Sequence, residues 1–258
     1  MKFQLLPSSF EDNGQASARQ HLACFIVDDE VAIDAGSLAM ATNSVQKQQI
    51  RDIVLTHAHL DHIAGLPLYI DDLFSTLRRP IQIYATAEII EVLERDIFNW
   101  SVYPRFSELE NDNGKVMEYC RFEAGEEFSI QHLQIKAVKV NHKVPCFGLI
   151  VSDGKTKFAL TSDTAEMDDF WQVLNEEENL STILVECAFP NELEELAQIS
   201  YHLTPKLLKK EIAKINNRDC LIYVVNIKPM YRDEIVRQIA ELNLENLQIL
   251  EVGQVYEW

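Results

Sequence analysis

The sequence predicts a mixed α/β (α+β) fold in which two β-sheets pack face to face with helices outside, a four-layer αββα sandwich. Two observations support this prediction. The early part of the chain reads as β-hairpins, and the second half alternates short apolar strands with amphipathic helices. No linker, repeat or low-complexity segment divides the 258 residues. We therefore expect residues 1–258 to form a single domain, because this length suits one large α/β domain.

In the first half, an Asp-Asp-Glu turn separates two apolar runs and predicts a hairpin. The turn at Asp34-Ala-Gly-Ser37 follows, and its glycine permits a close backbone approach. Strands are expected at residues 2–6, 22–27, 31–33, 53–55 and 81–84, with three short strands between 118 and 140. Helices are expected from Asp61 to residue 77 and over residues 87–98, whereas residues 100–113 read as irregular.

In the second half, Asp153-Gly154 lies between two apolar runs and predicts a hairpin of residues 147–151 and 157–160. Thr204 followed by Pro205 is typical of a helix N-cap with proline at the first helical position, and this helix should extend to about residue 215. Further strands are expected at residues 182–187, 221–225 and 247–252, and further helices at 166–175, 191–199 and 233–242.

Composition narrows the classes of function. The formal net charge is −18, and so acidic a surface repels nucleic acid and anionic lipid. No apolar run reaches the ~18 residues of a membrane span, and the N-terminus is a poor signal peptide. The five cysteines are scattered without a CxxC pair, which favours reduced thiols in the core. We expect a cytoplasmic protein.

The segment His57-Ala-His-Leu-Asp-His62 carries the strongest chemical signal. Four candidate metal ligands follow an apolar strand, and imidazole and carboxylate are ligands that Zn, Mn or Fe accept. Alternation along extended backbone directs His57 and His59 to the same side, and a turn lets Asp61 and His62 face a second ion. The alternative is a polar loop that happens to be rich in histidine. It is disfavoured because such a cluster beside an apolar strand needs partners.

Two further candidates follow the ends of apolar strands, where open α/β sheets collect ligand-binding groups. They are His142, after residues 135–140, and Asp163, after residues 157–160. Taken singly, His142 also fits a solvated loop, and Asp163 also fits a cap of the next helix. His21 and His132 hold no such positions, and we interpret them as ordinary histidines.

HAHLDH resembles the HxHxDH signature of the metallo-β-lactamase superfamily. The longer string HAHLDHIAGLPL resembles its class II cyclic-nucleotide phosphodiesterase branch, with a ligand order shared by tRNase Z. The resemblance implies an αββα sandwich of the metallo-β-lactamase type. It also implies that His57, His59 and His142 bind one ion, that Asp61 and His62 bind a second, and that Asp163 bridges the two. Asp34 would orient the metal-binding loop without binding a metal itself.

The stretch LVECAFPN through HLTP, residues 184–205, also resembles the phosphodiesterase branch. By that resemblance His202 faces the scissile phosphate as general acid or phosphate ligand, and Asp61 and His202 are the catalytic residues. The alternative for His202 is a place at a helix N-terminus without a chemical role. One departure stands out, because relatives have V-x-H-I-K-P where this chain has Val224-Val-Asn226-Ile-Lys-Pro. An Asn226 amide oxygen is a weaker zinc ligand than imidazole, so we expect a weak second site.

The resemblance implies a hydrolase that cleaves a small phosphodiester, specifically a 3′,5′-cyclic nucleotide such as cAMP or cGMP. Two Zn²⁺ ions about 3.5–4 Å apart, with Mn²⁺ or Fe²⁺ as alternatives, would hold the attacking hydroxide between them. We expect a homodimer with no nucleic-acid or membrane partner. The alternatives are a tRNase Z-like nuclease, for which the chain lacks a basic arm, a lactonase or thioesterase, and a non-catalytic member with a weakened second site.

Overall fold

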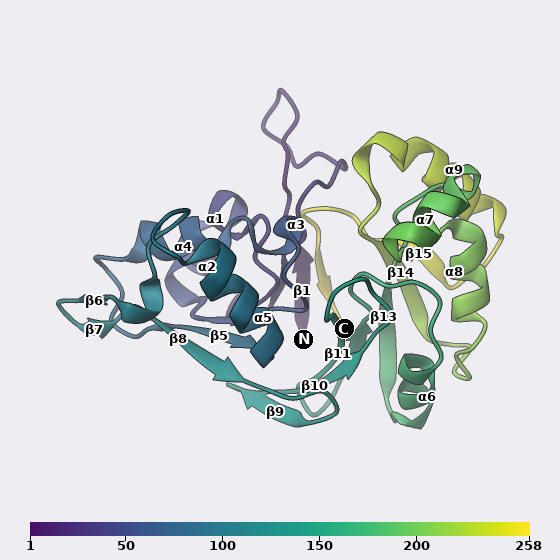
Figure 1. Ribbon diagram of the computed structural model, residues 1–258. Coiled ribbons are helices and arrows are strands. Elements are labelled where there is room, and N and C mark those ends of the chain that lie inside the picture. The colour runs from purple at the N-terminus through teal and green to yellow at the C-terminus, as the bar shows by residue number, and fades with distance from the viewer. The chain divides into compact units, whose positions relative to one another are not determined.

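The computed structural model describes residues 1–258, which form two compact units. Unit 1 comprises residues 1–17, 22–123 and 252–257, and unit 2 comprises residues 18–21, 124–251 and Trp258. Each unit has its own sheet and helices (Figure 1). The single-domain organisation expected from the sequence stays a prediction. None of the helices is both long and apolar enough to span a bilayer.

Unit 1 is built on a seven-stranded sheet with the order β16-β1-β2-β3-β4-β5-β8. Neighbours are antiparallel from β16 to β3 and parallel from β3 to β8. Because β3, β4 and β5 are parallel, the segments that follow them leave from the same edge of the sheet. The strands are β1 (Lys2–Leu5), β2 (Phe25–Val27), β3 (Val31–Ile33), β4 (Asp52–Val54), β5 (Ile81–Ala85), β8 (Met117–Arg121) and β16 (Val255–Glu257).

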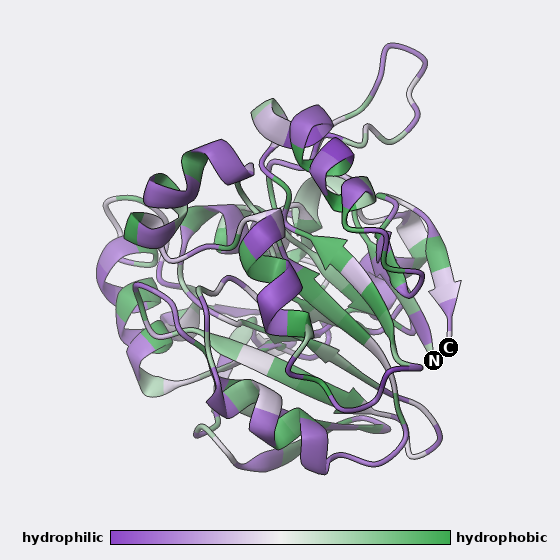
Figure 2. Ribbon diagram, turned by 90° about the vertical axis from the view of Figure 1, so that its right-hand side faces the viewer, coloured by the Kyte–Doolittle hydropathy of each residue, from purple (hydrophilic) through white to green (hydrophobic).

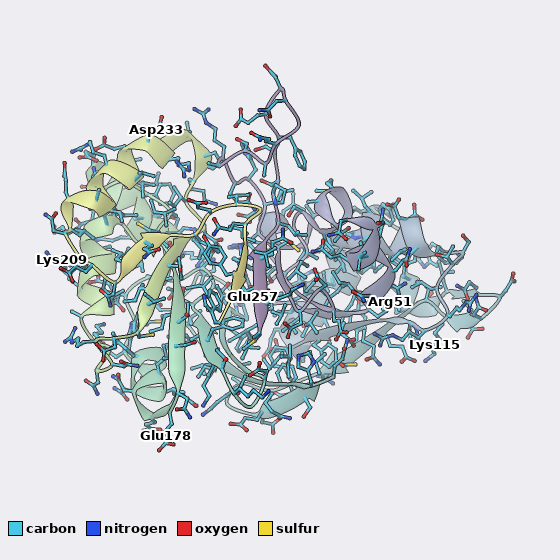
Figure 3. The ribbon with its side chains drawn as sticks, turned by 180° about the vertical axis from the view of Figure 1, so that it is seen from behind. Arg51, Lys115, Glu178, Lys209, Asp233 and Glu257 are labelled. Carbon is cyan, nitrogen blue, oxygen red and sulfur yellow. The ribbon has the colours of Figure 1, made fainter.

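The helices of unit 1 are short, and Figure 1 shows α1, α2, α4 and α5 on one side of β5 and β8. They are α1 (Leu38–Ala41), α2 (Ser44–Gln49), α3 (Leu60–Ile63), α4 (Leu66–Leu73) and α5 (Ala87–Val92), which continues as a π-helix over Leu93–Ile97. Asn43 and Gln46 form a capping box at the start of α2. A small hairpin of β6 (Glu110–Asn111) and β7 (Gly114–Lys115) follows a 3₁₀ turn at Phe106–Glu108, and Lys115 projects outward from it (Figure 3).

Unit 2 is built on a second seven-stranded sheet, ordered β15-β14-β13-β12-β11-β10-β9. Its strands are antiparallel from β9 to β12 and parallel from β12 to β15. The carboxyl ends of β12, β13 and β14 therefore share one edge of the sheet. The strands are β9 (Glu127–Ile130), β10 (Leu133–Lys139), β11 (Phe147–Ser152), β12 (Lys157–Leu160), β13 (Leu180–Glu186), β14 (Leu221–Val225) and β15 (Leu247–Ile249).

Four helices belong to unit 2, namely α6 (Asp169–Glu176), α7 (Glu194–Ser200), α8 (Pro205–Ile212) and α9 (Arg232–Glu241). Thr204 caps α8 as expected, since its side chain accepts a hydrogen bond from the backbone N–H of Leu207. Trp171, Leu208 and Ile235 bring α6, α8 and α9 into one core with the strands. The strands are mainly hydrophobic, while the helices turn hydrophilic faces outward (Figure 2).

Most expected elements form, and the differences concern boundaries and short elements. The helix expected from Asp61 to residue 77 is divided into α3 and α4 and ends at Leu73. The helix expected from residue 166 begins at Asp169, and the strand expected over 247–252 ends at Ile249. The helices α1 and α2 and the last strand, β16, were not expected from the sequence. The segment interpreted as irregular contains the β6–β7 hairpin.

Candidate metal centre

In unit 1, three histidines gather just beyond the end of β4. His57 and His59 follow the strand, His59 with extended backbone at the N-cap of α3, and His62 lies in the first turn of α3. The ring of His57 lies 4.8 Å from that of His59 and 4.1 Å from that of His62, centroid to centroid. His57 and His62 are buried, whereas His59 and Asp61 are partly exposed. The strand end therefore concentrates nitrogen donors at one place, as the motif predicts.

Asp34 fixes the orientation of this loop. Its buried carboxylate accepts hydrogen bonds from the backbone N–H of Thr56 at 2.8 Å and from the Thr56 hydroxyl at 2.8 Å. It also accepts one from Nδ1 of His62 at 2.7 Å. The Thr56 hydroxyl uses its single hydrogen on Asp34, so Nδ1 of His57, 3.1 Å away, must carry the proton that the hydroxyl oxygen accepts. In His57 and His62 alike, the lone pair is then on Nε2, the nitrogen that can bind a metal.

The backbone beneath the loop is packed too closely for a side chain at Gly36. A Cβ at this position would lie 2.0 Å from the carbonyl oxygen of Asp61. The same carbonyl accepts a hydrogen bond from Ala23, and the carbonyl of His62 accepts one from Ala35. The close approach expected of the DxG glycine is therefore present, and it holds Asp61 and His62 by their main chain.

In unit 2, His142 lies beyond β10 and is oriented by Tyr201. Nδ1 of His142 is 3.0 Å from the backbone carbonyl of Tyr201, and a carbonyl can only accept, so Nδ1 carries the proton and Nε2 the lone pair. Tyr201 adopts a left-handed conformation with φ of 61° at the end of α7. This unusual backbone for a bulky residue aims its carbonyl at the histidine, and such strain is typical of functional sites.

Asp163 follows β12 and is almost fully buried, with 2% of its surface exposed. One carboxylate oxygen, Oδ1, accepts a hydrogen bond of 2.7 Å from the side-chain amide nitrogen of Asn226. Ser162 and Asn226 both have left-handed backbone, with φ of 56° and 55°, directly beyond β12 and β14. From the sequence, Asn226 was expected to offer a metal a weak oxygen ligand, whereas its amide nitrogen is directed at Asp163.

His202 is held by Glu186, a residue that the sequence analysis did not single out as functional. Nδ1 of His202 lies 2.7 Å from Oε1 of Glu186. The carboxylate also accepts hydrogen bonds from three backbone N–H groups, those of Thr164, Ala188 and Leu203. In the sequence, the only hint of this role is that Glu186 ends the apolar run Leu184-Val185. A carboxylate buried at such a strand end needs hydrogen-bond partners, which points to a structural or functional role.

The contact between Glu186 and His202 shifts the pKa values of both groups. Burial raises the pKa of Glu186, although His202 opposes that shift. Burial lowers the pKa of His202, but the charge and hydrogen bond of Glu186 outweigh it, so the pKa of His202 is raised. Ligand atoms of Asp163, Glu186 and His202 all lie within 4.8 Å of one another. Glu186 spends its lone pairs on four hydrogen bonds, so this trio is poorly suited to hold a metal.

The remaining histidines are the two interpreted from the sequence as ordinary. His21 and His132 are exposed, and neither belongs to a group of side chains that could hold a metal. In four of the histidines that do belong to such groups, Nδ1 is the anchored nitrogen, as is common for metal-binding histidines. Each unit also has a carboxylate near its histidines, Asp61 in unit 1 and Asp163 in unit 2, and imidazole nitrogen with carboxylate oxygen is a donor set that suits a transition-metal cofactor such as zinc.

Comparison with solved structures identifies the fold. The metallo-β-lactamase fold protein YhfI from Bacillus subtilis matches with a TM-score of 0.74, 16% identity and 99% of each chain covered. Unliganded yeast PDE1 matches with a TM-score of 0.76, 18% identity and 97% of each chain covered. These matches confirm the metallo-β-lactamase fold expected from the sequence.

Sequence comparison then identifies the family. The chain belongs to the family described as Anti-Pycsar protein Apyc1, whose sequence model matches residues 19–216. It is also 27% identical over 230 residues to a probable 3′,5′-cyclic-nucleotide phosphodiesterase from Yersinia pestis. That match covers 78% of this chain and 63% of the relative, so the chain spans less than two thirds of that protein. The resemblance to cyclic-nucleotide phosphodiesterases is confirmed.

Proposed function

We propose that this protein is a metal-dependent phosphodiesterase that hydrolyses a small phosphodiester, specifically a 3′,5′-cyclic nucleotide. The observation that carries the proposal is the set of histidines anchored through Nδ1 at the strand ends, in a chain similar to a phosphodiesterase of that substrate class. Anchoring of this kind fixes tautomer and direction before a metal arrives, which favours a defined metal geometry.

For the metal ligands we propose the assignment that the superfamily pattern implies. His57, His59 and His142 serve one ion, Asp61 and His62 serve a second, and Asp163 serves both. Zn²⁺ is the proposed metal at two per chain, with Mn²⁺ or Fe²⁺ as alternatives, because all three accept imidazole and carboxylate. When bound, a pair of such ions polarises phosphate and lowers the pKa of water.

The residues of the chain itself supply orientation and proton transfer in this proposal. His202, with Nδ1 fixed on Glu186, presents Nε2 as a hydrogen-bond or proton donor to the departing ribose oxygen. Its raised pKa keeps the donor protonated to a higher pH than an ordinary histidine. Asp61, whose backbone carbonyl accepts a hydrogen bond from the N–H of Ala23, is proposed as the second catalytic residue beside His202.

The charge of the chain supports a small substrate over a polynucleotide. A net charge of −18 leaves too few cations to neutralise a phosphate backbone, so we propose no nucleic-acid partner and no membrane partner. We propose a cytoplasmic homodimer as the working form, as expected from the sequence.

The test is a hydrolysis screen after loading with Zn²⁺ or Mn²⁺. The substrates are cAMP and cGMP, bis-p-nitrophenyl phosphate, and an acyl-homoserine lactone as the carbonyl ester. We expect cyclic-nucleotide cleavage that is lost in His59→Ala and retained in His132→Ala, an exposed histidine outside the donor groups. Cleavage of the lactone alone would replace the proposal by a lactonase. Bound metal without any turnover would favour a non-catalytic member of the family.

A further inference from the structure

Asn226 makes one contact that a metal site alone does not require. Its side-chain nitrogen donates a 2.7 Å hydrogen bond to Oδ1 of Asp163. The orientation of the amide is fixed by chemistry, because a carboxylate can only accept and the amide must therefore direct its nitrogen at it. The amide oxygen then faces away from this carboxylate oxygen.

Asp163 needs such a partner because of where it lies. It is 2% exposed, and a buried carboxylate without compensating hydrogen bonds or charges destabilises the fold. Its main chain is held as well, since the Cys146 thiol contacts its carbonyl oxygen at 3.4 Å and the next residue, Thr164, donates its N–H to Glu186. The hydrogen bond from Asn226 to Oδ1 adds a restraint on the carboxylate itself.

The backbone at Asn226 suits this role. It has a φ of 55°, immediately beyond the last residue of β14. Asparagine is one of the few side chains other than glycine that adopt this left-handed conformation readily. The kink turns the side chain at the strand end, so one residue provides both the turn and the hydrogen bond.

We propose that Asn226 is a positioning residue for Asp163. It holds the carboxylate in place when no metal is bound, and it directs Oδ2 toward the metal when one is bound. The proposal rests on the proposed function in one respect, that Asp163 is a metal ligand. It assigns Asn226 a role through Asp163 in place of a role as a metal ligand.

The decisive variant is Asn226→Gly, because glycine keeps the left-handed backbone without strain and removes only the amide. We expect the affinity for Zn²⁺ to fall about 10–100-fold, the range found for partners of metal ligands, measured by competition with a chromophoric chelator. The matched control is Asn243→Gly, an exposed asparagine with a φ of 52° at the end of α9. It should leave the affinity unchanged.

Asn226→Asp tests the same contact by replacing the hydrogen bond to Asp163 with a charge repulsion. The new carboxylate cannot donate and repels Asp163, so the thermal midpoint in chelator should fall. Added zinc should then raise the midpoint by more than in the wild type, because the cation relieves that repulsion. Asn243→Asp should show the wild-type response in both conditions.

The outcomes separate this inference from the proposed function. Unchanged zinc affinity in Asn226→Gly, together with lost affinity in Asp163→Ala, overturns the role of Asn226 and leaves the proposed ligands standing. Unchanged affinity in Asp163→Ala overturns the ligand assignment and this inference with it. Reduced affinity in both, with the Asn243 controls unaffected, supports the inference.

Discussion

Asp34 and His62 form a fully buried hydrogen bond of 2.7 Å between Oδ2 and Nδ1, although 28 residues separate them in the chain. The same carboxylate also holds the main chain and hydroxyl of Thr56, which in turn contacts His57. One aspartate beyond β3 therefore sets the tautomer of two histidines beyond β4. This arrangement explains how a short loop can present several imidazoles in a fixed direction before any metal binds.

Asp34→Asn should weaken metal binding about 10–100-fold, because an amide group replaces one accepting oxygen by a donor and cannot serve both Thr56 and His62. Zinc titration against a competing chelator measures the effect. Asp29→Asn is the matched control, since Asp29 has the same left-handed backbone with φ of 60° on the β2–β3 turn. Equal zinc affinity in wild type and Asp34→Asn would show that the loop is oriented by its backbone alone.

Gly36→Ala should reduce both stability and metal affinity. The new Cβ would lie 2.0 Å from the carbonyl oxygen of Asp61, so the loop must move, and such overpacking costs about 1–3 kcal/mol. Gly148→Ala is the control, because its Cβ would meet the Phe170 ring at 2.4 Å in the core of unit 2. Both variants should lower the unfolding midpoint, and only Gly36→Ala should lower zinc affinity. If Gly36→Ala and Gly148→Ala lose equal zinc affinity, the loss results from general destabilisation and not from the movement of the loop.

The sequence predicted those features that depend on local chemistry. The Asp-Gly turn and the Thr204-Pro205 cap are each contained in a few consecutive residues, and each forms as expected. The histidine rings of HAHLDH lie close together, while their role as metal ligands stays a proposal. His142 and Asp163 were found because both follow apolar strands, which is also a local pattern. The expectation that they bind metal together with the HAHLDH residues came from the family resemblance.

Features that depend on distant residues were missed. β16 pairs with β1 across nearly the whole length of the chain, and no local pattern marks that pairing. The helix after the metal loop ends at Leu73, where the side chains of Asn111 and Asn113 bind the following carbonyls of Phe74 and Leu77. Glu186 and Asn226 are single polar residues at strand ends, and their partners become visible only in three dimensions.

Glu177 should make stability depend on pH in the acid range. Burial alone would favour its neutral form, but Lys157 at 2.6 Å and Lys136 at 3.4 Å outweigh burial and lower the pKa of Glu177. A carboxyl with a lowered folded pKa stabilises the fold above its unfolded pKa, about 4.3, and the stabilisation is lost as pH falls through the folded pKa.

Glu177→Gln should therefore lower the free energy of unfolding at pH 7, and the difference from wild type should vanish in acid. Urea unfolding at several pH values measures this. Glu178→Gln is the control, because Glu178 follows Glu177 in the chain and is exposed at the outer edge of the molecule (Figure 3). If the two variants lose equal stability at every pH, the lysine pair contributes nothing through Glu177.

The roles proposed for His202 and Glu186 predict a loss of turnover without a loss of metal. His202→Ala should reduce kcat for a cyclic nucleotide by about 10²–10⁴-fold, the usual contribution of a general acid.

Glu186→Gln should also reduce kcat, because the amide no longer fixes Nδ1 of His202 as a carboxylate does. The pKa of His202 should then fall toward that of an ordinary histidine. The alkaline limb of the kcat profile should then move to lower pH, an effect that a purely structural defect would not produce. Metal content measured by mass spectrometry is the control in both variants. Loss of one metal equivalent in His202→Ala would make His202 a ligand, and the proton-donor role would be withdrawn.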